Sequence, residues 1–98
     1  MKNRDKIILK LEKNRETIRQ FGVRRLGLFG SYAKGTEMPD SDLDFIVEFK
    51  TKSFDAYMDL KFYLEKLFKR RVDLVLSDVI KPRLRPTILK EAVYAPGL

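Results

Sequence analysis

The 98-residue sequence contains no cysteine and no histidine. Without cysteine, the chain has neither a disulfide framework nor a thiolate zinc site. Without histidine, it has no imidazole that serves as a general base or a metal ligand. Any metal ion must therefore be held by oxygen atoms, and carboxylates suit hard cations such as Mg²⁺.

Long apolar segments are also missing. No run of about eighteen apolar residues occurs, and residues 1–6 lead into an amphipathic pattern instead of the apolar core of a signal peptide. We therefore expect a soluble cytoplasmic protein with no membrane partner. The length predicts one small domain, residues 1–98, in which catalysis and binding share a single cleft.

Basic residues outnumber acidic ones. The chain has 21 lysines and arginines against 14 aspartates and glutamates, which gives a formal net charge of +7. This balance suits nucleic acid, nucleotide phosphates or an acidic protein partner, and charge alone does not choose among them. The basic groups at residues 69–71 and 81–85 are predicted to be solvated ends of secondary-structure elements, and the alternative is that they face the nucleotide or an acidic partner.

Hydrophobic periodicity predicts an alternation of helices and strands. The order fits an α/β (α+β) fold in which a small mixed β-sheet of about three strands packs with about four helices, mainly on one side. The aromatic residues of the helix predicted after residue 53 are expected in the core, and any that lies on the outer face of the helix would instead mark a partner interface. The predicted elements are a helix over 4–20, a strand over 23–29, a brief helix that Pro39 ends, a strand over 42–49, a helix over 53–69 with Ser53 as its N-cap, a strand over 71–77 and a last helix around 88–93.

The segment between the first two predicted strands carries the most specific pattern. Gly30 and Ser31 follow the first strand, and Asp42 and Asp44 open the second. Residues two apart on an extended chain leave the same face of a sheet, so the two carboxylates can share one cation. A glycine lets the backbone approach a phosphate, and the serine offers a hydroxyl and an N–H group. The pattern indicates a phosphate loop that leads into a metal-binding strand.

Three well-known phosphate and metal motifs do not fit this segment. Gly30 and Gly35 have the glycine spacing of a Walker A loop, but Thr36 stands where the lysine is required. The acidic residues begin like a calcium loop, but Phe45 replaces its glycine and Thr51 replaces its bidentate glutamate. A dinucleotide-binding glycine fingerprint is absent as well.

The remaining pattern resembles the DNA polymerase β-type nucleotidyltransferase superfamily. It consists of a strand, the pair Gly30-Ser31, the pair Asp42 and Asp44, and a later lone acid, Asp73, in a predicted strand, and it spans residues 23–77. In its short length the chain is similar to the minimal nucleotidyltransferase (MNT) antitoxins, which are paired with HEPN-domain toxins. The resemblance implies the nucleotidyltransferase fold and an antitoxin function.

The resemblance also implies a reaction. Asp42, Asp44 and Asp73 would be the catalytic residues and the metal ligands for two Mg²⁺ ions, while Gly30 and Ser31 would bind the nucleotide. Such proteins transfer AMP from ATP to a tyrosine of the HEPN toxin, release pyrophosphate and neutralise the toxin. Direct binding to nucleic acid is not expected. Because three close carboxylates repel one another, at least one is predicted to have a raised pKa in the absence of Mg²⁺.

Two alternatives stay open. The first is a non-catalytic antitoxin that masks its toxin by binding and keeps only a vestigial nucleotide site. The second is a subunit of an RNA or small-molecule nucleotidyltransferase, whose acceptor site a partner chain would have to complete. The intact set of three acids favours the enzyme over the masking protein.

Overall fold

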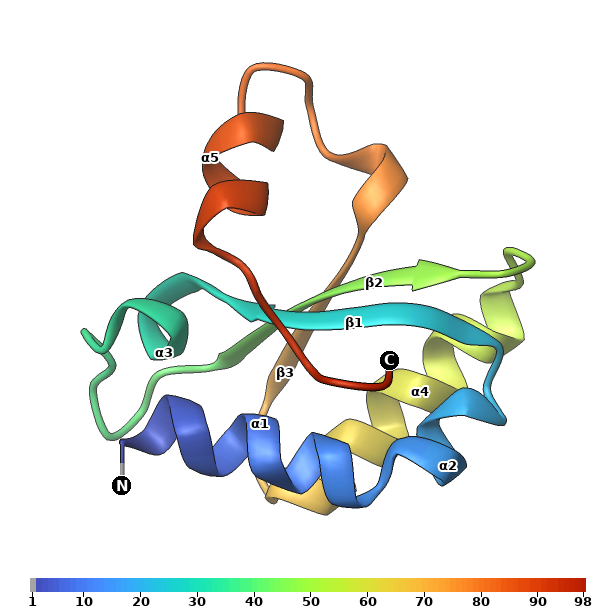
Figure 1. Cartoon of the computed structure of the whole chain (residues 1–98), viewed down its shortest axis with the longest axis horizontal. Coiled ribbons are helices and arrows are strands. Elements are labelled where there is room, and N and C mark those ends of the chain that lie inside the picture. Colours follow the sequence, from blue (N-terminus) through green and yellow to red (C-terminus); the bar gives the residue numbers. More distant parts are fainter. Residues whose placement is uncertain (1) are drawn as a thin grey trace.

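A mixed four-stranded sheet forms the centre of the computed structural model, which describes residues 2–98 (Figure 1). The strand order is β3-β2-β1-β4. Strand β1 is antiparallel to both β2 and β4, whereas β2 and β3 run parallel. The strands are β1 (Val23–Phe29), β2 (Leu43–Phe49), β3 (Val72–Leu76) and β4 (Val93–Tyr94).

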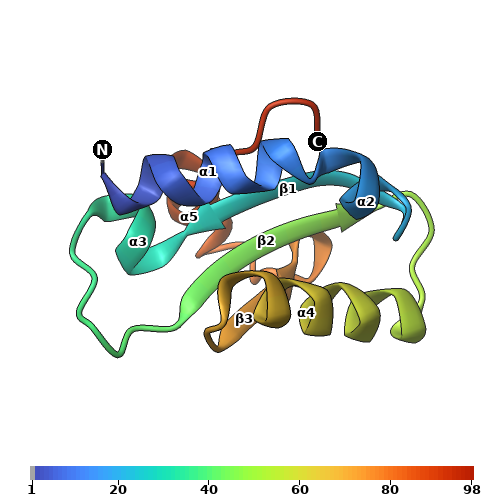
Figure 2. The same ribbon diagram turned by 90° about the horizontal axis from the view of Figure 1, so that it is seen from below.

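The helices are distributed unequally over the two faces of this sheet. Figure 2 shows α1, α2 and α4 on one face, while α5 lies behind the strands on the other. A short helix, α3, continues from the end of β1, and a 3-10 helix, η1, follows β3. The helices are α1 (Asn3–Lys13), α2 (Arg15–Arg19), α3 (Gly30–Lys34), α4 (Phe54–Phe68), η1 (Ser77–Val79) and α5 (Arg85–Glu91).

Alternation along the strands determines which side chains enter the main core. Leu28 lies opposite Phe45 in the β1–β2 ladder, and both are fully buried in one cluster with apolar residues of α1 and α4. Ile46, the next residue in β2, points to the opposite face because successive side chains of a strand alternate. Asp44 and Asp73 therefore lie on the face away from α1 and α4, where the helical cover is thinner.

The predicted helix over residues 4–20 is interrupted at Asn14. Helix α1 ends at Lys13 and α2 begins at Arg15, and the backbone of Asn14 leaves the helical region at φ −107° and ψ 16°. Its side-chain amide donates a hydrogen bond of 2.8 Å to the carbonyl oxygen of Lys10. A short polar side chain that bonds to the backbone in this way competes with helix continuation.

The brief helix after β1 ends earlier than predicted. Gly35, not Pro39, terminates α3, with φ +78° and an N–H that donates to the carbonyl oxygen of Ser31. This left-handed conformation suits glycine, which lacks a Cβ atom. The prediction that Pro39 ends this helix was wrong because the glycine closes it first.

The C-terminal region contains a strand that the sequence patterns did not predict. Helix α5 ends at Glu91, and residues 93–94 form β4 beside β1. The N–H of Ala95 extends this pairing by donating to the carbonyl oxygen of Leu26 at 2.9 Å. Pro86 lies in the first turn of α5, where a missing N–H costs nothing. The predicted fold class, a small mixed sheet packed with helices, is confirmed with one additional strand.

The helix predicted over residues 53–69 is confirmed as α4. The hydroxyl of Ser53 accepts a hydrogen bond of 3.3 Å from the N–H of Ala56 and caps the helix as predicted. Phe54 and Phe62, however, are exposed, so the prediction that the aromatic residues of this helix are core was wrong for these two. Within residues 2–98, no helix is long and apolar enough to cross a membrane.

Candidate active site

Three neighbouring strands bring the residues of the sequence motif into one row. Phe29, the last residue of β1, is the register partner of Asp44 in β2, and Gly30 comes next in the chain. Asp44 is in turn the register partner of Asp73 in β3. Since neighbouring strands are about 4.8 Å apart, the glycine and the two aspartates lie side by side across the sheet.

The position of Gly30 leaves no room for a side chain. Its φ is +74°, and an ideal Cβ at this residue would lie 2.2 Å from Oδ2 of Asp44. Any other residue would need both a strained backbone and a displaced carboxylate. The turn after β1 therefore brings bare backbone directly against the carboxylate of Asp44.

Asp42 precedes β2 and is exposed to solvent. Because Asp42 lies two residues before Asp44 in an extended chain, the two side chains leave the same face of the sheet. Oδ1 of Asp42 lies 3.6 Å from Nε of Arg71, another exposed residue. An exposed ion pair of this length is weak, so Asp42 is free to exchange this partner for another cation.

The environment of Asp44 penalises its negative charge. Burial raises the pKa of this carboxyl above its ordinary value of 3.8, and the nearby charges of Asp73 and Asp42 raise the pKa further. The predicted raised pKa is thus confirmed for one of the three acids. The leading cause is loss of solvent and not the predicted repulsion, because Asp44 is the half-buried member of the group.

The three carboxylates do not converge on a single point. Among residues 2–98, no group of three acidic side chains is placed so that it could hold a metal ion as it stands. The donor set still suits an oxygen-preferring cation, since Asp44 and Asp73 are register partners and the charge of Asp44 is poorly compensated. Asp42 and Asp73 are both exposed, so their side chains have room to turn toward such an ion.

Ser31 and Lys34 lie at opposite ends of α3. Ser31 follows Gly30 at the row of aspartates and is half-buried, and its carbonyl oxygen accepts a hydrogen bond of 2.9 Å from the N–H of Thr36. Nζ of Lys34 lies 3.4 Å from Oε2 of Glu91 on α5. Of the two residues, only Ser31 directly follows the glycine that contacts Asp44.

Arg70 is a residue that the sequence patterns missed. Its Nη1 donates to the carbonyl oxygens of Pro39 at 2.9 Å and Ser41 at 3.1 Å, and these residues lead directly into Asp42. Its guanidinium carbon is 5.6 Å from the ring centroid of Tyr32, which is buried. The basic triplet just before the strand that carries Asp73 was the available signal, and the prediction that it is a solvated helix end was wrong for Arg70, which is half-buried.

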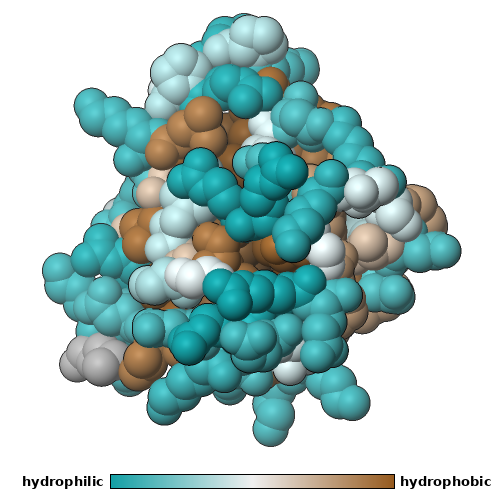
Figure 3. All heavy atoms as spheres, turned by 45° about the vertical axis from the view of Figure 1, so that its right-hand side comes forward, coloured by the Kyte–Doolittle hydropathy of each residue, from teal (hydrophilic) through white to brown (hydrophobic). Residues whose placement is uncertain are grey.

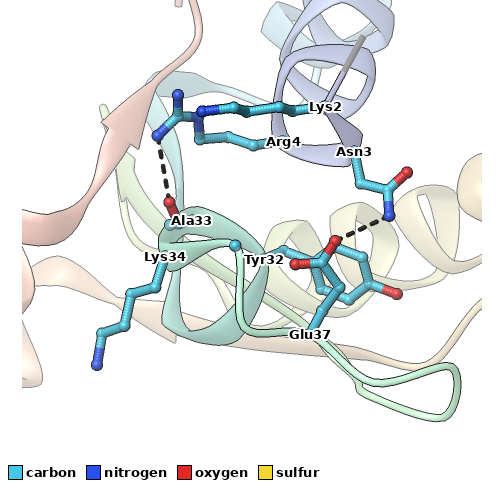
Figure 4. Close-up of a pocket in the computed structure, with 8 residues that line it drawn as sticks. Lys2, Asn3, Arg4, Tyr32, Ala33, Lys34 and Glu37 are labelled. Carbon is cyan, nitrogen blue, oxygen red and sulfur yellow. Dashed lines mark hydrogen bonds between the residues drawn. The ribbon is translucent and has the colours of Figure 1, made fainter.

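A pocket of about 310 Å³ lies away from the row of aspartates, between α1 and the C-terminal end of α3 (Figure 4). In it, the side-chain amide of Asn3 donates to Glu37 at 2.8 Å, and Nη1 of Arg4 donates to the carbonyl oxygen of Ala33 at 3.4 Å. These contacts attach α3 and the loop that follows it to α1. The pocket contains none of the predicted site residues.

A mixed sheet on which aspartates of two parallel strands meet a glycine turn is the arrangement of a nucleotidyltransferase. Residues 8–95 match the model of the nucleotidyltransferase domain family. The chain belongs to this family and is a nucleotidyltransferase. The resemblance that the glycine–serine pair and the aspartates indicated is thereby confirmed.

Individual relatives support the same assignment. The chain is similar to the protein adenylyltransferase MntA of Thermococcus cleftensis, with 42% identity over 81 residues and 82% of each chain covered. It resembles a solved structure of a minimal nucleotidyltransferase with 36% identity and a TM-score of 0.73, covering 88% of this chain and 93% of that one. It also resembles a chain of a toxin–antitoxin crystal structure with AMP-PNP, with 28% identity, a TM-score of 0.68 and coverage of 98% and 74%.

Proposed function

We propose that this protein is a Mg²⁺-dependent protein adenylyltransferase that acts as an antitoxin. It transfers AMP from ATP to a tyrosine of a cognate HEPN toxin and thereby neutralises the toxin. The observation that carries this proposal is the register of Asp44 with Asp73 beside the bare backbone of Gly30. The name of the MntA relative supports a protein acceptor, and the toxin–antitoxin neighbour with AMP-PNP supports an adenine nucleotide and a toxin partner.

In the proposed reaction, the tyrosine oxygen attacks the α-phosphorus of ATP. A new bond forms between this oxygen and the α-phosphorus. The bond between the α-phosphorus and the oxygen that bridges it to the β-phosphate breaks, and pyrophosphate leaves. The proton of the tyrosine passes to the exposed carboxylate of Asp73. Two Mg²⁺ ions, held by Asp42, Asp44 and Asp73, would neutralise the charge of the entering and leaving oxygens.

Gly30 and Ser31 have the role of positioning the triphosphate. Because residue 30 has no side chain, phosphate oxygens can approach the backbone beside Asp44. The hydroxyl and N–H of Ser31 then donate hydrogen bonds to the β- or γ-phosphate. This arrangement aligns the leaving pyrophosphate with the row of aspartates.

A labelling experiment tests the proposal. The purified chain and the protein encoded by the neighbouring gene are mixed with Mg²⁺ and ATP that is labelled in either the α- or the γ-phosphate. We expect the α-label, but not the γ-label, to become attached to the neighbouring protein. Asp44→Asn should abolish the transfer, while Asp59→Asn, an exposed aspartate on α4, should leave it unchanged. Transfer of the γ-label would instead identify a phosphotransferase and contradict the proposal.

Masking without catalysis is the second candidate function. It is favoured by the contact of Asp42 with Arg71 and by the lack of a converged group of three acids within residues 2–98. Growth assays with the toxin separate the two candidates. If Asp44→Asn still binds the toxin but no longer protects cells, catalysis is required, whereas full protection by this variant would establish masking.

A further inference from the structure

Residues 77–91, here called the arm, project from the face of the sheet that carries the aspartates. The arm contains η1, α5 and the loop between them, and Figure 1 shows it extending beyond the strands at the top of the molecule. None of the residues of α5 is buried. Ile80 is the buried residue of the arm. Most of the arm therefore faces solvent.

The arm exposes aliphatic side chains. Val79 is 60% exposed, Leu84 46% and Leu89 36%. Figure 3 shows apolar atoms, in brown, at the surface just below the top of the molecule, at the height of the arm. Exposed aliphatic side chains gathered on one projecting segment can be covered by an apolar surface of another protein.

The same segment is strongly basic. Residues 79–90 include two lysines and two arginines and no acidic residue. The two acids that flank them are already paired, because Asp78 forms an ion pair with Lys52 and Glu91 forms one with Lys34. The Lys52 contact lowers the pKa of Asp78, which keeps that acid ionised. The four cations are Lys81, Arg83, Arg85 and Lys90.

Both ends of the arm are connected to elements that carry site residues. Strand β3, which carries Asp73, leads directly into η1. At the other end of the arm, α5 is joined to α3 by the ion pair between Glu91 and Lys34, and α3 begins at Gly30. A macromolecule that presents a hydroxyl group to Asp73 approaches the face of the sheet from which the arm projects.

We propose that the arm is the docking surface for the acceptor protein, which covers Val79, Leu84 and Leu89 with apolar side chains and meets the arm's cations with acidic ones. This inference rests on the proposed function, since it concerns the acceptor of the same transfer. A nucleic acid is a poorer occupant because the arm has no aromatic residue for base stacking and exposes three aliphatic side chains.

Binding measurements on arm variants test the proposal. We use calorimetry to titrate the protein encoded by the neighbouring gene into the wild type, into Leu84→Ser and into Lys81→Glu/Arg83→Glu. Leu84→Ser should weaken binding by about tenfold or more, because truncation of a central apolar contact typically costs at least that much. The charge-reversal variant should bind more weakly and lose most of the salt dependence of the wild type.

Matched controls come from the opposite side of the protein. Phe62→Ser and Lys66→Glu alter exposed residues of α4, on the other face of the sheet, and should bind the acceptor like the wild type. All arm variants should bind ATP with unchanged affinity. A loss of ATP affinity in Lys81→Glu/Arg83→Glu, with acceptor binding intact, would assign these cations to the nucleotide and overturn the proposal.

The outcomes separate this inference from the proposed function. If the wild type binds and modifies the acceptor and the arm variants do both equally well, only the docking surface is wrong. If arm variants lose binding but the wild type shows no transfer, the docking surface stands and the transferase proposal fails. If the wild type neither binds nor modifies the acceptor, both proposals are overturned.

Discussion

Gly30 and Asp44 constrain each other at the scale of single residues. The glycine has a positive φ, and a Cβ atom added to it would collide with the carboxylate of Asp44. The local sequence is sufficient to identify both residues, because the Gly-Ser pair and the two aspartates lie within one short segment. Residue 30 must be glycine because it contacts a carboxylate on the neighbouring strand. This contact depends on the pairing of β1 with β2, which the local spacing of residues does not encode.

Substitution of Gly30 by alanine tests this contact. We expect Gly30→Ala to lose transfer activity by about 100-fold or more, since displacement of a metal-binding carboxylate impairs positioning. Gly22→Ala is the matched control because Gly22 has φ +85° and nothing within 4 Å of an added Cβ. Both variants should lose about 1–2 kcal/mol of unfolding free energy from backbone strain, but only Gly30→Ala should lose activity. Equal activity in the two variants would contradict the role of Gly30.

The raised pKa of Asp44 predicts a dependence of stability on pH. A folded-state pKa above the ordinary value of 3.8 means that the folded protein binds this proton more tightly than the unfolded chain. The contribution of Asp44 to stability is therefore full below pH 3.8 and is lost as the pH rises through the raised value. Asp44→Asn should be more stable than the wild type at neutral pH without Mg²⁺, and this difference should vanish in acid. Denaturant unfolding over a pH series measures it, and an Asp44→Asn variant that is less stable at neutral pH would be evidence against the charge penalty.

At the scale of secondary-structure elements, the loop between α3 and β2 is held by a residue distant in sequence. Arg70 bonds to two carbonyl oxygens of this loop, just before Asp42. Periodicity predicted the strands and α4 well because their apolar faces are buried in one core. It missed Arg70 and β4 because both depend on contacts with segments far along the chain.

Replacement of Arg70 should loosen the loop that positions Asp42. We expect Arg70→Ala to lower kcat by about 10-fold or more and to raise the Mg²⁺ concentration needed for half-maximal activity. The KM for ATP should change little. Arg24→Ala removes an exposed arginine that pairs with Glu48 at 3.3 Å on β2 and serves as the control. A change in stability with unaltered Mg²⁺ dependence would show that Arg70 is only a structural residue.

At the scale of the whole molecule, one helical layer leaves the opposite face of the sheet available for chemistry. The sequence predicted this mixed architecture because segments whose apolar residues recur with the spacing of a strand alternate with segments whose apolar residues recur with the spacing of a helix. It did not predict the arm as a separate feature, because Leu84 lies between Pro82 and Pro86 and Val79 comes just before them, where the apolar residues show no regular spacing. Their exposure depends on the three-dimensional path of the chain, which leaves the sheet after β3 and rejoins it at β4.

Mg²⁺ should stabilise the whole domain through the same carboxylates. At about 100 times its dissociation constant, the ion should raise the unfolding free energy of the wild type by about 2–3 kcal/mol. Thermal unfolding with and without Mg²⁺ measures this change. Asp42→Asn/Asp44→Asn should show little response. An equal increase in both proteins would mean that the ion binds elsewhere.

The intact mass of the co-expressed partner protein tests the central claim most directly. The chain is co-expressed with the protein of the neighbouring gene, either as the wild type or as Asp42→Asn/Asp44→Asn. We predict that the partner gains mass in whole AMP units with the wild type and gains none with the variant. A partner that is neutralised in a stable complex with no added mass would contradict the transferase and establish an antitoxin that acts by masking.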